Sequence, residues 1–139
     1  MEQDYIKRLI EEIGRILGKI ASDIIGLKNQ GQVGEVYEIV RQNFKAELDF
    51  DMDQLLAIDN ENLIRYLTEE KGFSTVDMEK LADIWCMVAE DTTRERQFRL
   101  WTSGLTLYEY VEETGGTYSI ERNGKMEWIR GVLRDNFSG

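Results

Sequence analysis

The sequence predicts an all-α bundle of five to six helices that forms a single domain over residues 1–139. The chain contains no proline, whereas proline interrupts helices and is common in the turns of other folds. Several segments repeat apolar residues at the spacing of one helical face. Glycine or a short polar residue stands at the boundaries of these segments, as it does at the ends of helices. A chain of 139 residues is also long enough to bury a core without disulfides or metals.

The first predicted helix follows Asp4 and ends near Gly31, where glycine takes the left-handed cap conformation. Its apolar residues recur every seven positions, most clearly in the row Ile6, Ile13, Ile20 and Leu27. Charged residues interrupt the stripe, which excludes a bilayer span and a secretory signal. A helix lying on a membrane would favour Lys and Arg over acids, but residues 4–23 carry four of each sign. We therefore expect burial in the bundle or in a dimer, with Gly14 and Gly18 facing a close neighbour.

Three further helices are predicted before residue 92. The second covers residues 32–46 and turns one apolar face inward, formed by Val33, Val36, Tyr37, Val40 and Phe44. Asp59 is the predicted N-cap of a third helix, which runs to Glu70 and buries Leu63, Ile64 and Leu67. Gly72 ends that helix, and Ser74 with Asp77 resembles a capping box at the start of the fourth. The inward face of the fourth helix consists of Met78, Leu81, Ala82, Trp85 and Val88 or Ala89.

The fifth predicted helix carries two apolar stripes. Thr92 with Glu95 resembles a second capping box at its start, and Gly115 with Gly116 stops it. One stripe of this helix carries Phe98, Trp101, Leu105 and Tyr108, and the other carries Leu100, Gly104, Leu107 and Val111. Because a helix with two apolar faces needs neighbours on both, we expect a central and largely buried position.

Residues 117–134 fit two structures. Alternating apolar residues around Asn123-Gly124, a favoured two-residue turn, indicate a β-hairpin. The same residues form a helix that buries Ile129, Val132 or Leu133, and Phe137. We favour the helix, since an isolated two-stranded hairpin is only marginally stable.

Two segments resemble degenerate tetratricopeptide helix pairs: GLKNQGQVGEVYEIV and ADIWCMVAEDTTRERQFRLWTSGLTLYEYVEE. Gly31 stands where such a repeat turns, and Trp101 and Gly104 stand where its second helix packs on a neighbour. The repeat proline is missing, Val36 and Gln97 replace small residues, and the two segments do not follow the repeat period of about 34 residues. We therefore expect antiparallel helix pairs without a regular tandem array.

Over nearly its whole length the chain resembles a group of small bacterial tetratricopeptide-like helical proteins of unknown function. The segments that carry the resemblance are MEQDYIKRLIEEIGRILGKI, GLKNQGQ and LTLYEYVEETGGTYSIERNGKMEWI. The resemblance implies a tetratricopeptide-like fold and a bacterial cytoplasmic setting. It implies no catalytic residues.

The composition argues against several classes of function. The formal net charge is −10, which is unfavourable for binding nucleic acid or an anionic membrane. The chain has no histidine, so Ser-His and Cys-His nucleophiles and the usual zinc sites are unavailable. A single cysteine, Cys86, cannot form an internal disulfide, and we expect an inert thiol that suits a reducing cytoplasm.

A calcium loop is suggested by the spacing of Asp49, Asp51 and Asp53. Such a loop also needs glycine at its sixth position and glutamate at its twelfth, where this chain has Gln54 and Asn60. We interpret the three aspartates as a solvated acidic helix start. A glycine-rich phosphate loop is also missing from the sequence, and we expect neither a metal nor a cofactor.

The candidate interaction residues are Arg94, Arg96, Arg99, Trp101 and Tyr108. The three arginines form the densest basic cluster, and aromatic residues lie close by. They suit an anion or a peptide carboxylate. They also suit pairing within the protein, either with Glu90, Asp91 and Glu95 or with the acidic residues between 47 and 61, and we favour this pairing.

Together these observations favour a non-catalytic protein-interaction module or small adaptor. Helical-repeat surfaces bind partners along extended faces, and an acidic face prefers basic or apolar peptides. A second copy of the chain, bound through the N-terminal helix, is the first partner that we expect. The alternative is a small-molecule-binding protein or a carboxylate-dependent enzyme, with Asp or Glu beside Tyr or Arg inside the bundle. A third interpretation, an acidic mimic of nucleic acid, rests on the net charge alone.

Overall fold

A computed structural model describes residues 2–115 and 117–137, with side chains from residue 11 onward. Over these residues the chain is all-α and forms seven α-helices without a strand. The helices are α1 (Glu2–Asn29), α2 (Val36–Leu48), α3 (Met52–Ala57), α4 (Asn60–Arg65), α5 (Thr75–Ala89), α6 (Arg94–Thr114) and α7 (Ile120–Phe137). A short 3₁₀ turn, η1 (Val33–Glu35), precedes α2, and a π-helical segment, η2 (Tyr66–Glu70), continues α4.

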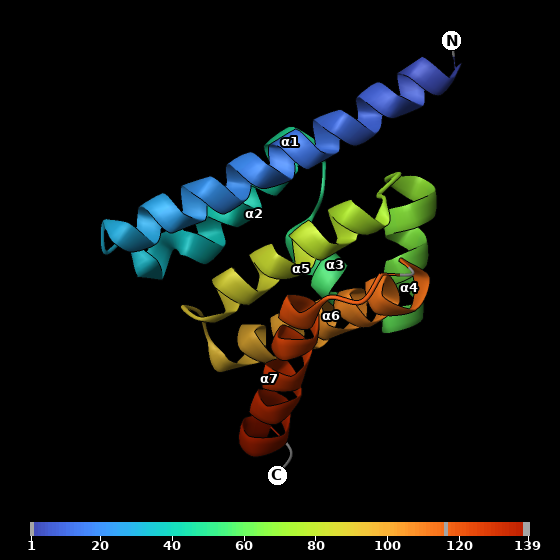
Figure 1. Cartoon of the computed structure of the whole chain (residues 1–139). Helices are drawn as coiled ribbons and strands as arrows, with labels where there is room; N and C mark the ends of the chain where they lie inside the picture. The colour runs from blue at the N-terminus through green and yellow to red at the C-terminus, as the bar shows by residue number, and fades with distance from the viewer. Residues whose placement is uncertain (1, 116, 138–139) are drawn as a thin grey trace.

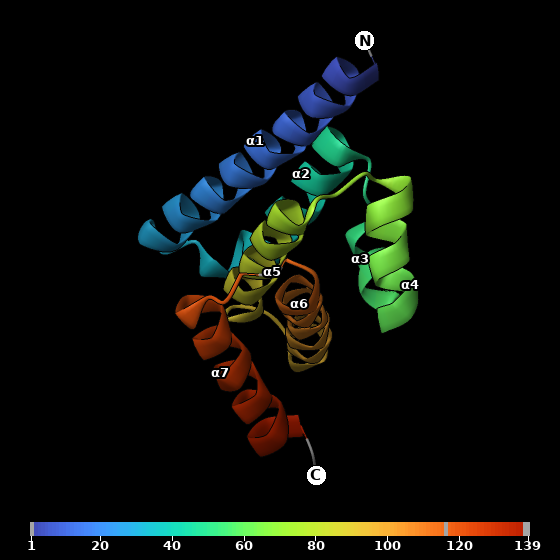
Figure 2. The same cartoon turned by 45° about the vertical axis from the view of Figure 1, so that its right-hand side comes forward.

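The helices are arranged around the pair formed by α5 and α6. The pair α1 and α2 packs on one side of α5, and α7 packs on α6 (Figure 1). The short helices α3 and α4 lie at one end and contact α6 (Figure 2). Because α6 has neighbours on several sides, it takes the central place that its two apolar stripes predict.

One hydrophobic core connects these helices, from Ile13 of α1 to Ile129 of α7. Phe44 of α2 meets Trp85 of α5 edge-on, with ring centroids 5.4 Å apart. Tyr108 of α6 and Ile129 of α7 are fully buried on the other side. The contacts that hold the fold are therefore long-range and mostly apolar.

The predicted helix boundaries agree with the structure at four places. Gly31 and Gly72 have positive φ angles of 77° and 69° and end their segments. Asp59 caps α4 by accepting a hydrogen bond from the backbone N–H of Asn62. Ser74 and Asp77 form the predicted capping box of α5, with each side chain accepting from the backbone N–H of the other residue.

The acidic segment does start a helix, as interpreted, because Asp51 is the N-cap of α3. Two local predictions are wrong. Val33 is 39% exposed rather than inward, because the chain makes a 3₁₀ turn before α2 begins. The N-cap of α6 is Thr93, which accepts from the N–H of Arg96, and not Thr92.

The last segment is the helix α7, as favoured, and not a hairpin. Asn123 lies inside this helix, where its side-chain amide donates to the carbonyl of Ser119 and to Glu112 of α6. Ile129 is buried against the core. Gly115 caps the end of α6, and Gly116 lies outside the described residues.

The first helix runs past the bundle that it covers. Residues Ile13 to Ile24 bury the predicted stripe, and both views show the N-terminal turns of α1 extending beyond α2 and α5 (Figures 1 and 2). A side chain at Gly14 would lie 3.5 Å from Nζ of Lys80, whereas one at Gly18 would meet no atom within 4 Å, so only the first glycine has a close neighbour. None of the helices described has the length and apolar character needed to cross a bilayer.

The capping box of α5 gives a stability prediction. Ser74→Ala removes the acceptor for the N–H of Asp77 and is expected to lower the free energy of unfolding by about 1 kcal/mol. Ser22→Ala, at an exposed position within α1, is the control and should leave stability unchanged or slightly raised. Urea denaturation followed by circular dichroism measures both, and equal values for the two variants would contradict the role of the cap.

The extension of α1 gives a prediction about assembly. The apolar stripe continues in the sequence over Ile6, Leu9 and Ile10, on turns that project past the bundle (Figure 1). We expect these turns to pair with a second copy, so that the mass in solution rises from monomer to dimer with concentration. Light scattering between about 1 and 100 µM, near typical Kd values for modest interfaces, checks this. Monomer mass throughout, or a dimer unaffected by Leu9→Glu, would contradict it.

Candidate functional site

The candidate site is a surface groove between α5 and α7, with α6 as its floor. We call it the α5–α7 groove. Its volume is about 440 Å³, within the range of ligand pockets. It is lined by Asp83, Cys86 and Met87 of α5 and its C-cap Glu90, by Trp101 and Tyr108 of α6, and by Lys125, Trp128 and Ile129 of α7.

Two tryptophans form the apolar part of the groove. Trp101 is only 4% exposed and lies at the base, whereas Trp128 is 55% exposed. Their rings meet edge to face, with centroids 5.0 Å apart and planes at 73°. Met87 and Ile129 extend the same surface. Tryptophan is large and apolar, so leaving half of Trp128 in water is unfavourable unless another molecule covers it.

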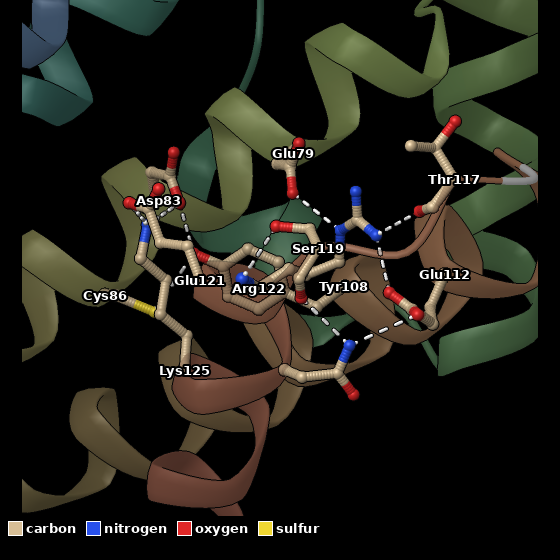
Figure 3. Close-up of polar contacts among 11 residues, drawn as sticks. Glu79, Asp83, Cys86, Tyr108, Glu112, Thr117, Ser119, Glu121, Arg122 and Lys125 are labelled. Carbon is tan, nitrogen blue, oxygen red and sulfur yellow. Dashed lines mark hydrogen bonds and ion pairs between the residues drawn. The ribbon is translucent and has the colours of Figure 1, made fainter.

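The polar end of the groove is a cluster around Asp83 (Figure 3). Oδ1 of Asp83 accepts a hydrogen bond from the hydroxyl of Tyr108 and lies 2.9 Å from Nζ of Lys125. Burial and the carboxylate raise the pKa of Tyr108 above its ordinary value, so the phenol keeps its proton. Burial raises the pKa of Cys86 to about 12, which means that its thiol does not form a nucleophilic thiolate at neutral pH.

At the other end of the groove, Lys28 of α1 contacts the lining residues Met87 and Glu90. Its ammonium group lies 2.6 Å from Glu90 and 3.2 Å from Asp91, and it donates to the carbonyl of Met87 at 2.7 Å. The C-terminal end of α5 is thereby tied to α1. Because cations stabilise helix C-termini, Lys28 also satisfies the dipole of α5.

Arg122 anchors the first turn of α7 against both α5 and α6 (Figure 3). The side chain is 7% exposed. Its Nε donates to Glu79 of α5 at 2.7 Å, and one Nη donates to Glu112 of α6. The same Nη donates to the carbonyl of Thr117 at 3.1 Å. Arg122 thus fixes the N-terminal end of α7, one wall of the groove.

The C-terminal end of α7 has a second anchor. Phe137 packs on Phe98 of α6 with ring centroids 5.5 Å apart. The guanidinium of Arg94 lies 4.7 Å above the Phe137 ring and donates to the carbonyl of Asn136. The groove lies between this anchor and Arg122.

The five predicted interaction residues do not form one cluster. Trp101 and Tyr108 line the α5–α7 groove, and Arg94 takes part in the anchor at the end of α7. Arg96 and Arg99 line a separate hollow of about 420 Å³.

In the separate hollow, neighbouring side chains partly offset the positive charges of Arg96 and Arg99. The guanidinium of Arg96 lies 3.9 Å from the ring centroid of Tyr37, whose hydroxyl donates to Asp53 at 2.5 Å. Arg99 pairs with Glu95 at 3.1 Å, one of the expected partners. Arg96 and Arg99 are therefore held by aromatic and acidic neighbours of α2, α3 and α6.

The three aspartates with the spacing of a calcium loop interact with different partners. Asp49 pairs with Lys45, Asp51 caps α3, and Asp53 accepts from Tyr37. Among the described residues, no group of acidic, Cys or His side chains has a geometry that would hold a metal ion. The buried polar residues in the described part of the chain are Asp77, Ser103 and Arg122, and the first and last have the structural partners given above.

Sequence reasoning did not identify Asp83, Lys125 or Trp128 as site residues. The signal was present, because Asp83, Cys86, Met87 and Glu90 have the i, i+3, i+4, i+7 spacing of one helical face. This face mixes apolar and charged residues, which is typical of a helix face at the edge of the hydrophobic core. Trp128 is one of the alternating apolar residues that indicate the hairpin alternative.

Comparison with protein-family models, with curated proteins and with solved structures found no match for this chain. The case for a function therefore rests on the groove itself.

The anchor at Arg122 gives a pH prediction. Hydrogen bonds from Arg122 and Asn123 hold the pKa of Glu112 below its usual value. A depressed pKa stabilises the fold above the ordinary glutamate pKa of about 4.3, and this contribution disappears as the pH falls through the folded-state pKa. We expect the wild type to be more stable than Glu112→Gln at pH 7, with the difference shrinking as the pH falls below that ordinary pKa.

Denaturant unfolding at a series of pH values measures this difference. Glu113→Gln, at an exposed neighbouring position, is the control and should show no such pH-dependent gap. A gap between the wild type and Glu112→Gln that stays constant from neutral to acid pH would show that ionisation of Glu112 does not hold α7.

Proposed function

We propose that the protein is a non-catalytic interaction module, or small adaptor, that holds a segment of a partner protein in the α5–α7 groove. The observation that carries the proposal is Trp128, which is 55% exposed and stands edge-on to the buried Trp101. Exposed apolar patches on a folded domain mark binding surfaces. Tryptophan is also among the residues that contribute most to binding energy at interfaces.

The helix arrangement supports this proposal. The antiparallel pairs α1 with α2 and α5 with α6 are each joined by a short connection (Figure 1), as in tetratricopeptide-like proteins. We extend the proposal to that class of fold and to a bacterial cytoplasmic setting, where a thiol such as that of Cys86 stays reduced. Proteins built from such pairs bind peptides along their helical faces.

The alternative is a small-molecule site in the same groove. Asp83 beside Tyr108 is the pairing of carboxylate and phenol that this alternative requires. It ranks second because Oδ1 of Asp83 already accepts from Tyr108 and Lys125. The raised pKa values of Tyr108 and Cys86 also leave these two groups protonated and unreactive.

The test uses Trp128→Ala with Tyr118→Ala as the matched control, since Tyr118 is an aromatic residue that is 70% exposed and does not line the groove. Immobilised wild type captures proteins from a lysate of the organism that carries the gene, and the retained protein is then purified. Titration of the purified partner should give a Kd that Trp128→Ala raises at least about tenfold, the loss of 1.4 kcal/mol or more typical of an anchor residue.

Tyr118→Ala should leave this Kd unchanged. A partner whose Kd is insensitive to Trp128→Ala would contradict the groove as the binding surface. Stabilisation of the wild type by metabolites, abolished in Trp128→Ala and without any protein partner, would favour the alternative.

A further inference from the structure

The walls of the α5–α7 groove are two helix faces. Asp83 and Glu90 lie two turns apart on α5, and Lys125 and Trp128 lie one turn apart on α7. Figure 1 shows α7 running away from α5, while both helices pack on α6. A groove between helices can take another helix, which inserts one apolar face. A whole helix is about 10–12 Å across, so it would lie over the hollow and fill it with side chains.

Acidic side chains outnumber basic ones around the groove, with two carboxylates to one ammonium group at each end. At one end Lys28 is shared by the carboxylates of Glu90 and Asp91. At the other end Lys125 is shared by Asp83 and Glu121, at 2.9 and 3.3 Å. Of these six residues Asp83, Glu90 and Lys125 line the groove, and the other three pair with them or beside them. Each pair of carboxylates shares one ammonium group, which leaves an excess of one negative charge beside each end.

We propose that the occupant of the groove is an amphipathic helix whose apolar face is flanked by two basic residues about two turns apart. The spacing follows from α5, where Asp83 and Glu90 are seven residues and hence about 10 Å apart along the axis. Lys or Arg at positions i and i+7 of the occupant would each neutralise one end. The apolar residues between them would cover Trp128 and Met87. This inference rests on the proposed function and specifies the chemistry of its partner.

The experiment selects helical peptides from a display library by their binding to the purified wild-type protein. The library keeps a fixed helix-forming frame with a leucine or aromatic stripe, and positions i and i+7 beside the stripe vary among Lys, Arg, Gln, Glu and Asp. Peptides are sorted at low salt, and selected ones are titrated by fluorescence anisotropy. The variants are Trp128→Ala, Glu90→Gln and, as a charge control away from the groove, Glu113→Gln.

The expected result is enrichment of Lys or Arg at both varied positions. Binding should be lost in Trp128→Ala, weakened several-fold in Glu90→Gln and in high salt, and unchanged in Glu113→Gln. Glu90 is exposed at the C-terminal end of α5, where a carboxylate opposes the helix dipole, so its replacement should not disturb folding.

Two results would overturn the inference and are distinguishable. Peptides that need Trp128 but show no preference for basic residues would leave the groove as a binding surface and refute the basic helix. Peptides that bind Trp128→Ala as well as wild type, or no enriched peptide at all, would refute the basic helix. Persistent binding to Trp128→Ala would also contradict the proposed function.

Discussion

The guanidinium of Arg122 is the contact on which the position of α7 depends. It joins three helices, because it pairs with Glu79 of α5 and Glu112 of α6 from the first turn of α7. A nearly buried guanidinium is stable only while its donors are satisfied. Two carboxylates and the carbonyl of Thr117 accept hydrogen bonds from its Nε and from one Nη here. The direction in which α7 leaves the bundle is therefore fixed by hydrogen-bond geometry as well as by apolar packing.

The groove is a consequence of holding α7 at its two ends. Arg122 holds the beginning, and the contacts of Phe137 with Phe98 and Arg94 hold the end. Between these anchors α7 packs on α6 but diverges from α5 (Figure 2). The divergence leaves Trp128 half exposed above Trp101. A core that closed completely would bury Trp128, so the anchors maintain an apolar surface that packing alone would tend to remove.

The sequence predicts the helices better than it predicts the site. Periodicity and caps identify α5 with its Ser74–Asp77 box, and they identify α6 as the central helix. Only the acidic start of α3 is predicted and not its extent, because a helix of six residues is too short to show a periodic apolar face. The ion pairs of Arg122 with Glu79 and of Lys125 with Asp83 span more than forty residues along the chain. Local patterns carry no information on such contacts. The basic cluster was visible in the sequence, but its three arginines diverge because Arg94 turns toward α7 while Arg96 turns toward Tyr37.

The central claim is that Arg122 holds α7 so that Trp128 stands against Trp101 and still faces water. The most direct measurement is NMR of the tryptophan indoles in the wild type and in Arg122→Leu. The account predicts a nuclear Overhauser effect between Trp101 and Trp128 in the wild type, together with rapid exchange of the Trp128 indole N–H with water. It predicts loss of that effect in Arg122→Leu, while the contact between Phe44 and Trp85 in the core remains. A contact between Trp101 and Trp128 that persists unchanged in Arg122→Leu, or that is missing in the wild type, would contradict the account.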